Sequence, residues 1–187
     1  MRVYTKTMKL ETMRDLYVVE LEDLYDAENR IVKNLPKMIE AASSSELRTA
    51  LTDHLEKTRG HVQRLEQIFQ GMGQKAKGET CDGMKGILDE GEHMVKEDGS
   101  PNVKDAGLIA GAQRVEHYEI AAYGSVRTWA QQLGYENDAN LLQQTLDEEK
   151  DADKRLTAIA ESSVNPTAAP GSPGSNTMQQ PRTSTAV

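Results

Sequence analysis

Four long segments of this chain carry apolar residues three and four positions apart, which is the spacing of one face of an α-helix. The segments cover about residues 10–35, 46–70, 103–134 and 137–162. At 1.5 Å per residue, each helix would be roughly 37 to 45 Å long. Helices of this kind bury their apolar stripes by packing side by side, so the pattern predicts a helical bundle.

Turn-forming residues separate these segments. Three serines at 43–45 mark the first turn, and the second helix is expected to stop at the Gly-Met-Gly sequence at 71–73. A shorter amphipathic helix follows at about 84–95, and Asp-Gly-Ser-Pro-Asn at 98–102 marks the next break. Two helix pairs joined by a long connection that contains a short helix predict an all-α, ferritin-like four-helix bundle with one crossover.

The composition favours the same fold and excludes several functions. Aromatic residues make up only 4% of the 187 residues, whereas strand-rich folds depend on aromatic and β-branched side chains. The net charge of -8, without a dense basic stripe, argues against nucleic-acid binding. Cys81 is the single cysteine, which excludes an intramolecular disulfide or a cysteine-based zinc cluster. No run of about 18 apolar residues occurs, so we expect a soluble, cytoplasmic protein that does not span a membrane.

The composition changes abruptly at Ser163. Residues 163–187 hold four of the six prolines, Arg182 is their only charged residue, and Leu, Ile and Phe are absent. Such a segment buries too little apolar surface to offset the entropy lost on ordering its backbone. We therefore predict a helical domain over residues 7–162, followed by a flexible tail rich in Pro, Ser, Gly and Thr over 163–187.

Ionisable residues interrupt each apolar stripe at positions that face the bundle axis. On the first segment, Glu28 lies between Leu24 and Ile31 in the same register. The other segments place these polar residues on or beside their stripes: His54, Thr58 and His61; Glu116 and Glu119; Glu149 and Asp153. A buried carboxylate without compensation is costly or takes up a proton. Because almost no Lys or Arg lies on these stripes, a bound cation is the predicted source of positive charge.

Spacing alone leaves two interpretations open. A lone Glu on a helix stripe is usually a partly exposed edge residue, and His54 and His61 would then be half-buried histidines with hydrogen bonds across the bundle. The other interpretation is a metal site, because carboxylate oxygens and imidazole suit iron or manganese. The coincidence on all four helices favours the metal site. We expect His93 and His117 to face solvent.

The sequence around these positions resembles a known family. Four segments are similar to the YciF/YciE-like bacterial stress-response proteins of the ferritin-like superfamily: LYDAENRIVKNLPKM, HLEKTRGHVQRLEQIF, LIAGAQRVEHYEIAAYGSVRTWAQQLG and LLQQTLDEEKDADKRLTAIA. The resemblance covers about residues 8–162, and RVEHYEIAAYG is its most specific block. It implies a four-helix bundle with a short extra helix, a homodimer and expression under stress.

The resemblance also implies a set of metal ligands. Ferritins and their relatives hold two metals with Glu on the first and third helices and Glu-x-x-His on the second and fourth. Matched by position, the implied ligands here are Glu28, His61, Glu116, Glu119, Glu149 and Asp153. Thr58 stands where the second helix should carry a bridging Glu, and Ala152 replaces the His of the fourth helix, with Asp153 as its nearest substitute. These departures are compatible with one or two ions.

The leading hypothesis is a ferritin-like stress protein that binds iron or manganese and carries out oxygen- or peroxide-linked redox chemistry on a small oxidant. In it, Tyr25, Tyr118 and Tyr123 lie near the metal and donate hydrogen bonds or electrons. The alternative is a non-enzymatic dimeric helical bundle with a degenerate metal site, which acts as a structural or interaction protein. The sequence leaves open whether the chain is an enzyme.

Overall fold

The computed structural model describes residues 10–169, and within this range the chain is helical without strands. The helices are α1 (Met13–Ala41), α2 (Ser45–Gly71), α3 (Asp82–Lys96), α4 (Pro101–Gln132), α5 (Glu136–Ile159), a π-helical turn (Ala160–Val164) and α6 (Asn165–Ala168). No helix of the described range is both long and apolar enough to cross a membrane.

Local sequence explains where the first two helices begin and end. The Thr12 hydroxyl accepts the N–H of Asp15 at 3.1 Å, and the Asp15 carboxylate accepts the N–H of Thr12 at 2.9 Å, which forms a capping box at the start of α1. The Ser44 hydroxyl caps α2 through the N–H of Leu47. Directly after α2, Gly73 has a φ of 71°, in the left-handed region that favours glycine.

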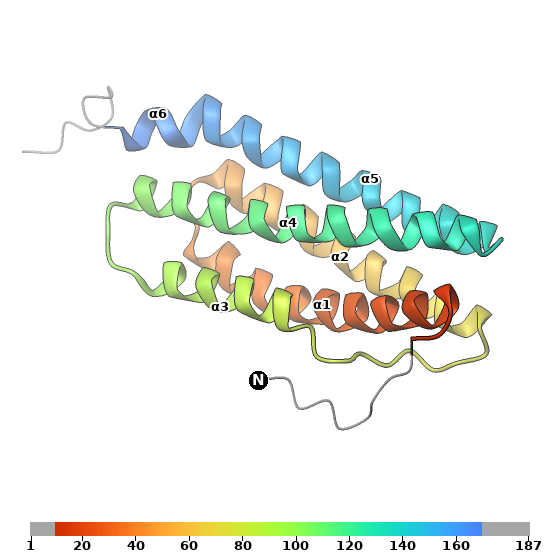
Figure 1. Ribbon diagram of the computed structural model, residues 1–187. Coiled ribbons are helices and arrows are strands. Elements are labelled where there is room, and N and C mark those ends of the chain that lie inside the picture. The colour runs from red at the N-terminus through yellow and green to blue at the C-terminus, as the bar shows by residue number, and fades with distance from the viewer. Residues whose placement is uncertain (1–9, 170–187) are drawn as a thin grey trace, which may run out of the picture.

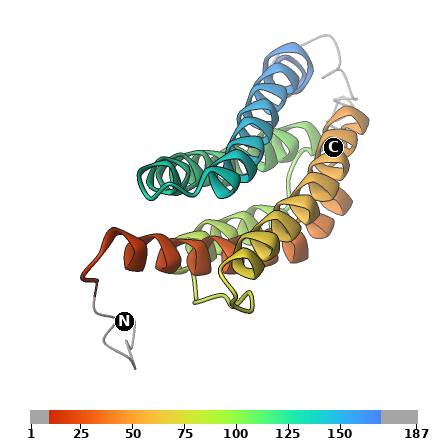
Figure 2. The same ribbon diagram turned by 90° about the vertical axis from the view of Figure 1, so that its right-hand side faces the viewer.

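The four long helices form two antiparallel pairs, α1–α2 and α4–α5, that pack on each other (Figure 1). Figure 2 shows the two pairs as separate layers, with α2 against α5 and α1 against α4. The chain leaves α2 at one end of the bundle and returns through α3 to begin α4 at the other end. This crossover confirms the predicted ferritin-like bundle, with α3 as the extra helix of the middle connection.

The core consists of two apolar clusters, one toward each end of the bundle. The first contains Leu35, Leu51 and Ile109 together with residues from the C-terminal end of α5, and the second is built around Leu21, Leu65 and Tyr123. Each long helix contributes to both clusters, so each must pass through the layer between them. That layer holds the ionisable residues of the four stripes.

Helical structure continues beyond residue 162, where the predicted domain ends. The π-helical turn and α6 extend it to Ala168, and Val164 is 4% exposed because it packs into the first apolar cluster. Burial of this one apolar side chain gives the start of the predicted tail a reason to stay helical. Residues 170–187 of the predicted tail lie outside the described range.

Candidate metal centre

Six ionisable side chains from all four long helices converge between the two apolar clusters. We call them the core cluster: Glu28 of α1, His54 and His61 of α2, Glu116 and Glu119 of α4, and Glu149 of α5. His54, the most exposed of the six, is 7% exposed. The cluster exists because a helix with one polar residue in an apolar stripe carries that residue inward when the stripe is buried.

The core cluster contains two sets of metal-ligating atoms. The first set comes from His54, Glu116, Glu119 and Glu149, and the second comes from Glu28, His61 and Glu149. Within each set, one ligand atom per residue lies within 4.8 Å of the others. Glu149 belongs to both sets. A carboxylate shared in this way can bridge two ions, as in two-metal sites whose ions lie about 3.5–4 Å apart.

The imidazole of His54 is available as a ligand. Its Nε2 atom lies 3.3 Å from Glu116 Oε1 and 3.9 Å from Glu149 Oε2, and neither ring nitrogen has a hydrogen-bond partner. Burial lowers the pKa of His54, which favours the neutral ring with a free lone pair. The predicted ligand set omitted His54. Its position two helical turns before His61, on the same stripe, was the sequence feature that could have identified it.

The imidazole of His61 is oriented by a partner outside the core cluster. Its Nε2 lies 2.8 Å from Glu148 Oε2, and Arg64 holds the same carboxylate with two hydrogen bonds of 2.8 Å. Because a carboxylate only accepts, the Nε2 atom donates its proton to Glu148. The other nitrogen, Nδ1, then faces Glu149 at 2.8 Å and Glu28 at 3.4 Å. A carboxylate that orients a histidine in this way is usual behind metal ligands.

Most of the unsatisfied polar atoms of the described chain belong to the core cluster. Ten buried side-chain nitrogen and oxygen atoms lack a hydrogen-bond partner, and nine of them lie on the six cluster residues. His61 Nδ1 is among them, since its short distance to Glu149 lacks hydrogen-bond alignment. Each buried polar atom without a partner costs about 1–3 kcal/mol. Carboxylate oxygens and imidazole nitrogens left free at one point fit the donor set of iron or manganese.

Burial and mutual repulsion shift the titration of the cluster in the metal-free protein. Burial, reinforced by the charge of Glu149, raises the pKa of Glu116 and Glu119 well above the usual value. Burial opposes protonation of His61, but the charge of Glu28 and the hydrogen bond that His61 donates to Glu148 raise its pKa to about 12. Burial likewise opposes ionisation of Glu149, yet the charged His61, 2.8 Å away, holds the pKa of Glu149 below the usual value. Metal binding at this cluster must therefore release protons.

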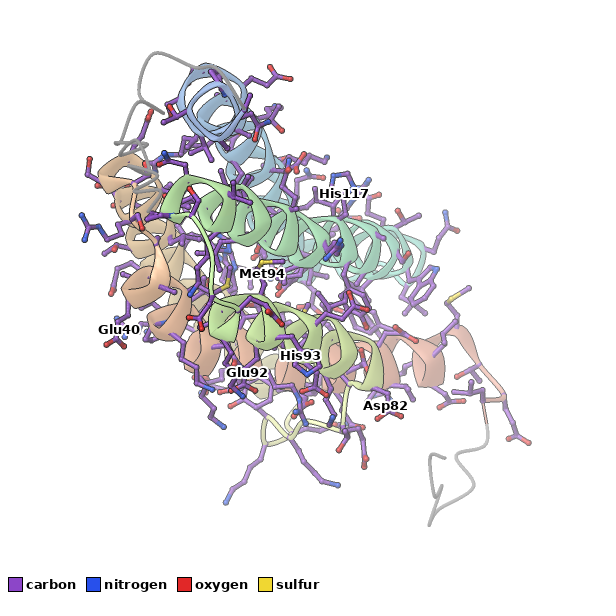
Figure 3. All side chains as sticks on the ribbon, turned by 90° about the vertical axis from the view of Figure 1, so that its left-hand side faces the viewer. Glu40, Asp82, Glu92, His93, Met94 and His117 are labelled. Atoms are coloured by element: carbon purple, nitrogen blue, oxygen red, sulfur yellow. The ribbon has the colours of Figure 1, made fainter. Side chains whose placement is uncertain are left out.

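Five of the six predicted ligands lie in the core cluster, and Asp153 does not. Its Oδ1 atom accepts a hydrogen bond of 3.0 Å from Gln113 and lies 3.3 Å from Nε2 of His117. The His117 side chain is 70% exposed and lies on the outer face of α4 (Figure 3). Asp153 lies four residues after Glu149, about 6 Å further along α5, where its short side chain meets Gln113 and His117 of α4 instead of the cluster.

The two positions that depart from the superfamily pattern have different environments. Thr58 is 1% exposed, and its hydroxyl donates to the backbone oxygen of His54 at 2.8 Å. Ala152 lines a pocket of about 30 Å³ between α2 and α5 that also contacts His54 and Glu116. An ion pair of 2.8 Å between Asp53 and Arg155 lies at its outer side. The small side chain at 152 thus leaves a route from the surface to the cluster.

The three tyrosines expected near the metal have different hydrogen-bond partners in the structure. The Tyr123 hydroxyl donates to Glu28 Oε1 at 2.5 Å, and the ring is 1% exposed. Tyr25 instead donates to Glu66, and Tyr118 donates to Asp23 of α1. Tyr123 is therefore the tyrosine that contacts the core cluster.

An all-α bundle with one crossover and a carboxylate–imidazole cluster at its centre defines a ferritin-like protein. Comparison with known proteins gives the family. The chain belongs to the family described as Domain of unknown function (DUF892), whose model matches residues 12–169. Protein YciF of Escherichia coli (strain K12) is 40% identical over 159 residues, which cover 84% of this chain and 96% of YciF.

Solved structures agree with this assignment. The crystal structure of the stress protein YciF of E. coli matches with a TM-score of 0.80 over 83% of this chain and 98% of YciF, at 40% identity. YcfI of Rhodopseudomonas palustris, provisionally described as a structural protein, matches with a TM-score of 0.80, at 41% identity, over 83% of this chain and 99% of its own. A protein of Xanthomonas campestris shares the fold at 18% identity and a TM-score of 0.66, covering 80% of this chain and 92% of that protein.

Proposed function

We propose that this chain is a bacterial stress protein that binds iron or manganese in the core cluster and uses the metal for oxygen- or peroxide-linked redox chemistry. The nine unpartnered buried atoms of the cluster carry the proposal. The stress role rests on the similarity to YciF, which is described as a stress protein. One or two cations would replace the protons of the metal-free cluster and satisfy the free oxygen and nitrogen atoms.

The charges of the cluster favour cation binding. Four carboxyl groups lie within one buried layer, and once metal binding has released their protons, a charged His61 would offset only one of them. The guanidinium of Arg64 is already paired with Glu148 through two hydrogen bonds. A divalent ion would therefore gain more from this layer than from the solvated acidic surface, where charge is screened.

The residues of this chain have distinct roles in the proposal. Glu149 would bridge the two ligand sets, and Glu116 and His54 would hold an ion beside the Ala152 pocket. Tyr123 positions Glu28 through their hydrogen bond, and Glu148 keeps the Nε2 proton of His61 so that Nδ1 faces the metal. Iron or manganese, when bound, supplies electrons for the reduction of dioxygen or peroxide.

Metal analysis of protein purified without chelators tests the proposal. We expect iron or manganese at near-stoichiometric levels in the wild type, little in Glu116→Ala, and an anomalous-scattering peak at the centre of the bundle. Only trace metal in both proteins after purification and after reconstitution with Fe(II) or Mn(II) would refute it. Consumption of dioxygen or peroxide by the reconstituted protein then tests the redox chemistry separately.

A second candidate function is a dimeric structural bundle with a degenerate metal site. Thr58 and Ala152 favour it, because they remove one carboxylate and one imidazole from the superfamily pattern. The provisional description of YcfI as a structural protein agrees. A ligand that binds the folded state alone must raise the melting temperature. If Fe(II) and Mn(II) leave the melting temperature unchanged, the structural function is preferred.

A further inference from the structure

A narrow apolar groove lies where α3 packs across α1 and α4. Figure 3 shows this side of the molecule, with Glu92 and Met94 of α3 labelled. The outer part of the groove has a volume of about 20 Å³ and is lined by residues that include Ile87, Val95 and Gly111. An ion pair of 3.2 Å between Lys37 and Glu92 joins α1 to α3 at its edge.

The groove continues inward to the core cluster. An inner part of about 10 Å³ is lined by residues that include Ile31, Leu35 and Ala112, and it ends at His54 and Glu116. The two parts adjoin, because they share four lining residues: Asn34, Met38, Leu88 and Val115. The groove approaches the cluster from the side of α1, α3 and α4, whereas the pocket at Ala152 lies between α2 and α5.

Two glycines line the outer part of the groove. Gly111 of α4 is buried and Gly91 of α3 is half-buried, and a Cβ atom added to either would meet no atom within 4 Å. Glycine inside a helix costs about 0.5–1 kcal/mol relative to alanine. Close packing does not require glycine at Gly111, in contrast to Gly83, where an added Cβ would lie 2.8 Å from the Tyr118 ring. A longer side chain at Gly111 therefore has room to enter the groove.

The size and lining of the groove define its occupant. A water molecule needs two to four polar partners and a cavity of about 10–15 Å³. The shared section offers one polar side chain, Asn34, and its Nδ2 already donates to the Arg30 carbonyl at 2.9 Å. A nonpolar molecule about as small as water fits this section without losing hydrogen bonds.

We propose that this groove binds dioxygen and leads it to His54 and Glu116. The choice of dioxygen among small nonpolar molecules rests on the proposed function, because the metal held there would reduce it. Ions and nonpolar molecules then reach the same two ligands from different sides. Besides Glu116, the lining of the pocket at Ala152 includes four charged residues, whereas the section shared by the two parts of the groove has none: Asp53, Lys57, Asp151 and Arg155 line the pocket.

Oxygen-pressurised NMR of the full metal-free chain tests the proposal directly, because dissolved dioxygen is paramagnetic and speeds the relaxation of nearby methyl groups. The methyls of Leu35 and Val115 line the inner groove. Those of Leu142 and Leu146 are similarly buried in the second apolar cluster, away from it. We expect a several-fold larger oxygen-induced relaxation at Leu35 and Val115. Equal enhancement at all four residues in the wild type would overturn the proposal.

Two matched variants locate the effect. Gly111→Leu places a side chain in the outer groove, whereas Gly124→Leu makes the same change on α4 at a position that also has open space but does not line it. We expect the enhancement at Val115 to fall to the level of Leu146 in Gly111→Leu and to persist in Gly124→Leu. If the enhancement at Val115 persists in both variants, dioxygen does not enter through the outer groove and the proposal is refuted. The wild-type comparison decides the proposal even if Gly111→Leu fails to fold.

The relaxation measurement tests the groove separately from the metal function, because it needs no metal. Enhanced relaxation in a chain that binds neither iron nor manganese would support the groove as a binding site and refute the metal function. Stoichiometric metal without selective relaxation at Leu35 and Val115 would support the metal function and refute the groove.

Discussion

Replacement of Glu119 by Gln should separate metal affinity from metal-free stability. Glu119 is 0% exposed, and both of its carboxylate oxygens lack a hydrogen-bond partner. Gln has nearly the same size but no charge, so it removes a ligand of the set that includes His54, Glu116 and Glu149 without creating a cavity. We expect a large loss of metal affinity and no loss of stability in the metal-free protein.

The magnitude follows from the role of Glu119 as a direct ligand. Residues that only orient ligands change metal affinity by about 10–100-fold, so loss of a ligand should cost at least about 100-fold, or about 2.8 kcal/mol. At free metal of about 100 times the wild-type Kd, binding stabilises the wild type by about 2.7 kcal/mol and the variant by about 0.4 kcal/mol. Because 1 kcal/mol shifts Tm by about 2–4 °C at this size, metal should raise the wild-type Tm by about 5–11 °C and the variant Tm by about 1 °C.

Calorimetric melting with and without Mn(II) measures both quantities. Asp153→Asn is the matched control, because Asp153 lies outside the core cluster and pairs with Gln113 and His117. Its metal-induced shift should equal that of the wild type. Without metal, Glu119→Gln and Glu116→Gln should melt at or above the wild-type temperature, since each removes a buried carboxyl group from a repulsive cluster.

Two results would refute this reasoning. One is a metal-induced shift of Glu119→Gln equal to that of the wild type, which would exclude Glu119 as a ligand. The other is a loss of several kcal/mol in both metal-free variants, because the carboxyl groups would then be structural hydrogen-bond partners rather than ligands waiting for a cation.

Three further predictions concern the surroundings of the cluster. Glu148→Gln should weaken Mn(II) binding in titration calorimetry by about 10–100-fold, because Glu148 orients His61, whereas Asp147→Asn on the exposed face of the same helix should not. The folded-state pKa values of Glu116, Glu119 and His61 are raised above the unfolded values of 4.5 and 6.5, so their stabilising contributions are complete below those values and decline as pH rises. The pKa of His54 is instead lowered from 6.5, so its contribution to stability increases as pH rises toward 6.5 and stays constant above that value. The free energy of unfolding of the metal-free protein, measured in urea, should therefore fall between about pH 7 and about pH 8.5. A rise over this range would contradict the assignment. Glu116→Gln should make this pH dependence weaker. Finally, Asp105 is 1% exposed and accepts the N–H groups of Ser43 and Ser44 at 2.8 and 2.7 Å. Asp105→Ala should therefore lower the free energy of unfolding, measured in urea, by about 3 kcal/mol. Asp98→Ala, at an exposed position, is the control, and an equal free energy of unfolding for the two variants would contradict the assignment.

Sequence periodicity determined most of the secondary structure and four carboxylates of the cluster. Caps such as Ser44 and turn residues such as Gly73 act within a few neighbouring residues, so they are readable before any tertiary contact forms. Because a helix repeats every 3.6 residues, a Glu in register with a buried stripe must point inward wherever the helix packs. Glu28 and Glu149, each 0% exposed, follow this rule.

Only the tertiary structure decided which other groups join the cluster. His54 and Asp153 both lay near a stripe, yet His54 meets Glu116 and Glu149 across the bundle, whereas Asp153 meets Gln113 and His117 outside it. Periodicity sets the direction of a side chain around its own helix, but not the axial offset between helices. That offset depends on how the two apolar clusters pack, and it decides which ligand atoms come within reach of one ion.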